Sequence, residues 1–154
     1  MTSTDSFEDR VKIGDNATAR LVKRLEQHGL IVTKTGQEYV LKSGVHPIIR
    51  FQRNFTAEFA RHFPDLLCAA PNLEPFYAEA KATSEKYWEG PNFSVETASL
   101  DICQFLDRNG VHIAIFFENR PDEFYADWAK NIKPFRQDGY AMIELKIITA
   151  RARQ

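Results

Sequence analysis

Two carboxylates and a lysine occur at a spacing that could support metal-assisted hydrolysis. Glu79 and Lys81 lie two residues apart in the segment PFYAEAK (residues 75–81), whose composition is that of a β-strand. Because side chains alternate between the two faces of a strand, both would project from the same face. Asp65 begins the preceding apolar segment, so a hairpin between the two segments would bring its carboxylate to the same place.

Two carboxylates beside a lysine form an oxygen-rich site suited to Mg²⁺, an ion that keeps several waters and takes few protein ligands. A bound metal lowers the pKa of its water and neutralises charge on a phosphate, while the lysine orients the nucleophile or stabilises the developing charge. The reaction that such a site serves is hydrolysis of a phosphodiester. The alternative is an exposed strand-face pair, Glu79 and Lys81, with Asp65 as a turn residue. That arrangement would contribute at most about 1 kcal/mol of stability and no activity.

The elements that must position these residues predict an α/β protein. The first expected helix is amphipathic, and an almost continuous apolar strand follows the helix after the lysine. The expected elements, in chain order, are a helix from Asp15 to Gly29, a hairpin over residues 30–41, a helix with a basic side within residues 48–63, paired strands at 65–70 and 75–81, a helix from Ser94 to Asn109, a strand at 111–117, a helix over 121–132 and a last strand at 140–150.

The composition bounds the class of protein. A chain of 154 residues with 44% hydrophobic and 27% charged residues predicts one globular domain over residues 1–154, with residues 1–13 as a flexible arm. The net charge of -1 means that nucleic-acid binding would depend on a local basic surface. No apolar run reaches the roughly 18 residues of a membrane span, and no Gly-rich phosphate loop occurs. We therefore expect a cytoplasmic protein with no membrane partner and no nucleotide cofactor. We expect Cys68 and Cys103 to be buried thiols, with a disulfide between them as the alternative that the sequence does not require.

Pro64-Asp65, then thirteen residues, then Glu79-Ala80-Lys81 resembles the signature of the PD-(D/E)XK, or restriction-endonuclease-like, nucleases. The resemblance implies a restriction-endonuclease-like core of order αβββαβ, with a mixed central sheet flanked by helices, here followed by an extra C-terminal helix and strand. The layout is most similar to that of the small Holliday junction resolvases and related single-domain endonucleases. By this resemblance Asp65 and Glu79 hold Mg²⁺, with Mn²⁺ as a substitute, the Ala80 carbonyl assists, and Lys81 serves catalysis.

The sequence departs from the family pattern on the first helix. Many relatives carry a glutamate there as a further metal ligand, but the matching position falls near Thr18, which is not acidic. Glu38, on the expected hairpin, is the substitute that we favour over Glu26, because a strand residue can face the site. Some relatives also have a glutamine on the helix after the lysine, and Gln104 is the matching candidate for a catalytic residue.

Basic and aromatic residues outside the motif are candidates for DNA contacts. Arg50, Arg53 and Arg61 would lie on the basic side of the helix within residues 48–63, where they could contact phosphates. A solvated helix surface has the same composition, so both interpretations stay open. Lys86 and Trp88 follow the motif in an expected loop, where they would suit stacking on an unpaired base or packing against the domain edge.

Together these features predict a magnesium-dependent DNA endonuclease that acts as a homodimer on DNA. Its substrate would be structure-specific, as for the Holliday junction resolvases, or site-specific, as for restriction and homing enzymes. The expected setting is intracellular: nucleoid-associated, or phage-encoded in a host cell. The alternative from another class is a non-catalytic DNA- or protein-binding module on the same fold.

Overall fold

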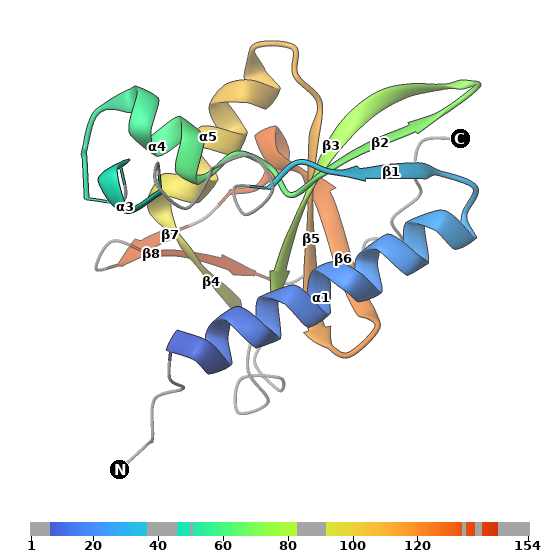
Figure 1. The fold of residues 1–154 in the computed structure, drawn as a ribbon, viewed down its shortest axis with the longest axis horizontal. Helices are drawn as coiled ribbons and strands as arrows, with labels where there is room; N and C mark the ends of the chain where they lie inside the picture. The colour runs from blue at the N-terminus through green and yellow to red at the C-terminus, as the bar shows by residue number, and fades with distance from the viewer. Residues whose placement is uncertain are drawn as a thin grey trace.

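The computed structural model describes residues 7–36, 46–49, 51–82, 92–133, 135–137 and 140–144. These residues form a mixed sheet with helices on both sides and a small second sheet (Figure 1). The elements are α1 (Phe7–Gln27), β1 (Ile31–Lys34), α3 (His46–Ile49), α4 (Phe55–Arg61), β2 (Leu66–Ala70), β3 (Leu73–Ala82), β4 (Asn92–Glu96), α5 (Thr97–Arg108), β5 (Ile113–Arg120), β6 (Glu123–Trp128), the 3₁₀ turn η2 (Ala129–Asn131), β7 (Phe135–Gln137) and β8 (Tyr140–Glu144).

The central sheet has the strand order β1-β2-β3-β5-β6. β3 and β5 are parallel, and every other neighbouring pair in this sheet is antiparallel. Parallel neighbours need a long crossover connection, and α5 lies in the connection between these two strands. The order α1, β1, β2, β3, α5, β5 confirms the expected αβββαβ core and its mixed sheet flanked by helices.

The two faces of the central sheet carry separate hydrophobic clusters. On one face, Leu21 and Leu25 of α1 pack with Ala78 of β3 and Phe116 of β5. The opposite face packs against α5, which buries Cys103 against the sheet. Because both faces of β5 are covered, its first five residues, Ile113 to Phe117, form a continuous apolar run rather than an alternating one.

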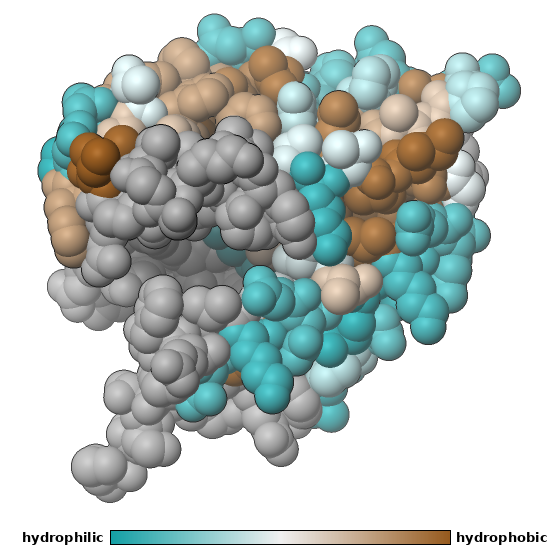
Figure 2. Space-filling model, in the orientation of Figure 1, coloured by the Kyte–Doolittle hydropathy of each residue, from teal (hydrophilic) through white to brown (hydrophobic). Residues whose placement is uncertain are grey.

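The outward face of α1 is mainly hydrophilic, and an apolar area lies beside it over β1, where Ile31 is 71% exposed (Figure 2). Cys68 and Cys103 are buried free thiols, as expected. Among the described residues, no helix is both long and apolar enough to cross a membrane.

Two of the expected helices differ from those in the structure: one begins earlier, and the other is divided into two. α1 begins at Phe7, so residues 7–13 belong to the helix and not to the flexible arm that the sequence predicted. Asp9 is an acidic residue in its first turn, where negative charge interacts favourably with the positive end of the helix dipole. The helix expected within residues 48–63 is divided into α3 and α4. Asn54 starts the second one, because its side chain accepts a hydrogen bond from the N–H of Ala57 at 2.8 Å.

The prediction of a helix over residues 121–132 was wrong, because this segment forms β6 and then the turn η2. Phe124 and Trp128 are four residues apart, a spacing that fits one face of a helix and also one face of a strand. The chain turns sharply before β6, where Asp122 has a φ of 66°. The extra C-terminal helix is therefore absent from the described residues, whereas the expected last strand is present as β8.

Two strand expectations also changed. The helix expected from Ser94 begins at Thr97, because residues 92–96 form β4, which pairs with β8 in the second sheet. The first half of the expected hairpin is β1, which pairs with β2. Its second half, residues 38–41, lies outside the described residues.

An ion pair ties α1 to the end of β5. The guanidinium of Arg20 donates from Nε and Nη2 to the two carboxylate oxygens of Glu118, each at 2.6 Å. The Glu118 side chain is 4% exposed and that of Arg20 32%. The Asp122 N–H also donates to Glu118, at 3.0 Å. This carboxylate is therefore buried and depends on Arg20 for its neutralisation.

Arg20→Ala should lower the free energy of unfolding by about 2 kcal/mol, because it leaves the buried charge of Glu118 without its cation. The value is below that of a fully buried pair because Arg20 is partly exposed. Arg24→Ala is the matched control. It removes an exposed hydrogen bond to the Asp122 carbonyl and a contact over the Phe124 ring, and should cost less than about 1 kcal/mol. Urea unfolding followed by circular dichroism measures both, and equal losses in the two variants would contradict this role of Arg20.

Candidate active site

The β2–β3 register brings Asp65 and Glu79 together. Leu66 lies opposite Ala78, so Asp65, the residue before β2, lies opposite Glu79 on the same face of the sheet. The backbone N–H of Asp65 donates to Glu79 Oε1 at 3.2 Å, and the N–H of Ala80 donates to Asp65 Oδ2 at 2.9 Å. Glu79 is 5% exposed. The two carboxylates therefore converge in a largely buried place, as the sequence predicted.

Lys81 joins the same site, together with a serine that the sequence did not single out. The ammonium of Lys81 lies 3.1 Å from Glu79 Oε2 and donates to Ser99 Oγ at 2.8 Å. The Ser99 hydroxyl in turn donates to Glu79 Oε2 at 3.3 Å. Ser99 is a buried polar residue four positions before Cys103, on the helix face that packs against the sheet. A polar residue at a position of the apolar helix face was the sequence feature from which Ser99 could have been identified.

The charges in the site act strongly on one another. Burial and the neighbouring Glu79 carboxylate raise the pKa of Asp65 well above its ordinary value, and the Ala80 N–H and Lys81 offset this only in part. Burial alone would lower the pKa of Lys81, but the carboxylates of Glu79 and Asp65 outweigh it and raise that pKa. Lys81 is therefore a cation at neutral pH, suited to donating hydrogen bonds and not to acting as a general base.

The donor set fits a hard divalent cation. Two carboxylates lie side by side close enough to penalise each other's charge, and a divalent ion between them would remove that penalty. In the part of the chain that the structure describes, no group of three or more His, Cys, Asp or Glu residues could hold a metal. At the Asp65 and Glu79 site the protein ligands would be the two carboxylates, with the Ala80 carbonyl as a further candidate. So few protein ligands suit an ion that keeps several waters. Glu38, the other candidate ligand, lies outside the described residues.

Gln104 does not contact this cluster in the hydrogen bonds that the structure shows. Its side-chain N–H groups donate to the carbonyl oxygens of Ala129 at 3.1 Å and Ile132 at 2.9 Å. Gln104 is 5% exposed, so both bonds are buried. These contacts anchor η2 on α5, and the catalytic role that the family resemblance implied for Gln104 stays a prediction.

The basic residues chosen as DNA contacts have different surroundings. The Arg61 guanidinium is engaged by nearby residues. It donates hydrogen bonds to the carbonyl oxygens of Ala57 and Gln52 and forms an ion pair with Glu58 at 3.7 Å. Its side chain is 12% exposed, which leaves little of it for a phosphate. Arg50, Lys86 and Trp88 lie outside the described residues.

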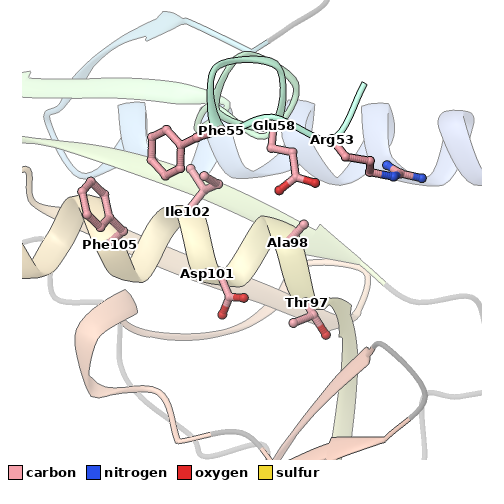
Figure 3. A pocket seen from close by; sticks show the side chains of 8 residues that line it. All are labelled: Arg53, Phe55, Glu58, Thr97, Ala98, Asp101, Ile102 and Phe105. Atoms are coloured by element: carbon pink, nitrogen blue, oxygen red, sulfur yellow. The ribbon is translucent and has the colours of Figure 1, made fainter. Parts of the chain in front are cut away.

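Arg53 is exposed and lines a pocket of about 590 Å³ between α4 and α5 (Figure 3). Phe55 and Phe105 lie together on one side of it, with ring centroids 5.4 Å apart. Glu58 and Asp101 also line this pocket, so its two carboxylates outnumber its one arginine. This charge balance does not favour a phosphate inside the pocket itself.

The order of elements and the mixed sheet define an α/β domain of restriction-endonuclease-like fold. A solved structure with this fold is Hjc of Archaeoglobus fulgidus, described as a Holliday junction resolvase from an archaeal hyperthermophile. The match has a TM-score of 0.53 at 11% sequence identity and covers 85% of this chain and 83% of that chain. No family model and no curated protein matches the sequence. The similarity to Hjc is therefore one of fold.

Proposed function

We propose that this protein is a metal-dependent DNA endonuclease that hydrolyses phosphodiester bonds. The observation that carries the proposal is the convergence of Asp65, Glu79 and Lys81 on one face of the central sheet. The fold shared with a Holliday junction resolvase supports it, because Asp65 directly precedes the second strand of the αβββαβ core and Glu79 and Lys81 lie on the third.

Asp65 and Glu79 would hold Mg²⁺ or Mn²⁺, with the Ala80 carbonyl and Glu38 as further candidate ligands. When bound, the ion would lower the pKa of water for attack on phosphorus and neutralise charge on the phosphate. The Ala80 N–H fixes the Asp65 carboxylate, and Ser99 and Lys81 fix one oxygen of Glu79. The chain thus presents both carboxylates in one defined arrangement before any ligand arrives.

Lys81 would supply positive charge to the reacting phosphate. An ammonium has three N–H donors, of which two point to Glu79 and Ser99. These two contacts set the direction of the third donor, which can orient a water or stabilise negative charge that develops on a phosphate oxygen. The lysine side chain is 23% exposed, so a bound substrate could reach it.

DNA would be held by basic residues outside the motif, and two copies of the chain would address two strands. Arg53 is the described candidate for a phosphate contact, and Arg50, Lys86 and Trp88 are further candidates. Both a four-way junction and a linear duplex are possible substrates within the proposed class. A homodimer would place two active sites on one DNA molecule.

A cleavage assay tests this proposal. End-labelled four-way junction, linear duplex and single-stranded DNA would be incubated with the protein in Mg²⁺, in Mn²⁺ and in EDTA. We expect cleavage of at least one double-stranded or branched substrate with either metal and none in EDTA. Salt-sensitive DNA binding without cleavage under all conditions would support the non-catalytic binding module instead.

A further inference from the structure

The Ser99 hydroxyl lies between the two charged groups of the site. It accepts a hydrogen bond from Lys81 Nζ at 2.8 Å and donates one to Glu79 Oε2 at 3.3 Å. A hydroxyl has one hydrogen and two acceptor positions, so its hydrogen is committed to the carboxylate and its lone pairs face the ammonium. Ser99 is 2% exposed, which keeps water from replacing either bond.

A serine in the first turn of a helix normally uses its hydroxyl locally, on the helix N-terminus or on a nearby backbone carbonyl. Ser99 is the third residue of α5, yet the bonds of its hydroxyl go to side chains of β3. The hydroxyl therefore connects α5 to the proposed catalytic strand and not to its own helix.

We propose that Ser99 is a positioning residue, which holds the Lys81 ammonium and the Glu79 carboxylate in the arrangement that phosphodiester hydrolysis needs. The proposal rests on the function proposed above. Lysine has a long flexible side chain, and without a fixed acceptor its ammonium would sample several rotamers. A displacement of about 1 Å at such a group costs on the order of 10²-fold in rate.

Ser99→Ala should therefore lower kcat for DNA cleavage about 10- to 100-fold and leave KM for DNA within about twofold. Ser99→Thr keeps a hydroxyl on the same carbon and should recover most of the rate. The matched control is Asn109→Ala, just beyond the far end of the same helix, which removes a side-chain hydrogen bond to the Phe105 carbonyl and should leave kcat unchanged. A purely structural serine would lower thermal stability without this selective loss of kcat.

A second measurement does not depend on cleavage. Nuclear magnetic resonance of the ¹⁵N-labelled lysine ammonium groups, with the Lys81 signal assigned through Lys81→Met, reports whether that group is held. We expect a slowly exchanging Lys81 signal in the wild type and in Ser99→Thr, and its broadening in Ser99→Ala. An unchanged signal in Ser99→Ala would overturn the positioning role even if the wild-type protein does not cut DNA. Absence of cleavage with the NMR contrast intact would overturn the nuclease proposal alone.

Discussion

Glu79→Gln should lower kcat/KM for DNA cleavage at least about 10³-fold, because it removes one of the two carboxylates that are proposed to hold the metal. Loss of a metal-ligand interaction worth about 4 kcal/mol to the transition state corresponds to that factor. Glutamine has nearly the shape of glutamate. The substitution removes a charge that, after burial, raises the pKa of Asp65, and it leaves Asp65 as a counter-charge for Lys81. The free energy of unfolding should therefore stay within about 1 kcal/mol of the wild type, so that lost activity is not lost folding. Single-turnover cleavage and urea unfolding measure the two quantities.

The control for this prediction is Glu74→Gln, because Glu74 lies on the same strand, β3, but is exposed and pairs with His112 at 3.3 Å. This variant should cleave DNA within about twofold of the wild type, since exposed pairs contribute little. If Glu79→Gln kept more than a tenth of the wild-type activity, the proposed ligand role of Glu79 would be wrong.

Lys81→Met should lower kcat by about 10²- to 10³-fold while the protein still binds the metal. The reason is that a preorganised donor aimed at developing charge contributes about 3 to 4 kcal/mol to the transition state. Removal of a cation beside Asp65 and Glu79 leaves their attraction for a divalent ion as strong as before or stronger. Single-turnover kinetics gives kcat, and titration with Mn²⁺ followed by electron paramagnetic resonance gives the affinity for the metal.

Lys130→Met serves as the control, because Lys130 is an exposed residue of η2 whose described hydrogen bond is made by its backbone N–H. It should not change either quantity. A Lys81→Met protein that cleaves as the wild type does would remove the lysine from the mechanism. One that no longer binds Mn²⁺ would instead make Lys81 a structural support of the carboxylates.

The core of the site could be predicted from the sequence because its geometry depends on local rules. Pro71-Asn72 marks a tight turn between two apolar segments, and an antiparallel pair closed by such a turn has a nearly fixed register. In the structure the register shifts by one residue between Cys68 and Ala70, and this shifted register sets Asp65 opposite Glu79, whereas the two-residue period of a strand adds Lys81 to the same face. The sequence did not predict this shift.

Ser99 and Gln104 required tertiary information. Both are polar residues of α5, and only the packing of α5 on the sheet shows that one reaches Lys81 and the other reaches the carbonyls around η2. Arg61 also required tertiary information. Its positive charge suggested a phosphate contact, but in the structure its N–H groups interact with the nearby Gln52 carbonyl and Glu58 carboxylate.

The errors in the fold arose where two periodicities coincide or where strands pair over long distances. The spacing of Phe124 and Trp128 fits both a helix and a strand. The segment is a strand because β6 pairs with β5. β4 is hydrogen-bonded to β8, which lies far along the chain, so no local sequence pattern predicted this strand.

A crystal of the protein grown with Mn²⁺ and measured near the manganese absorption edge tests the central claim most directly. We predict an anomalous peak within bonding distance of one Asp65 oxygen and one Glu79 oxygen, with Lys81 Nζ beside it and not bonded to it. The same crystal of Glu79→Gln should show this peak weakened or lost. Manganese bound at other residues, with both carboxylates still held only by their protein contacts, would contradict a metal site here and the hydrolysis that depends on it.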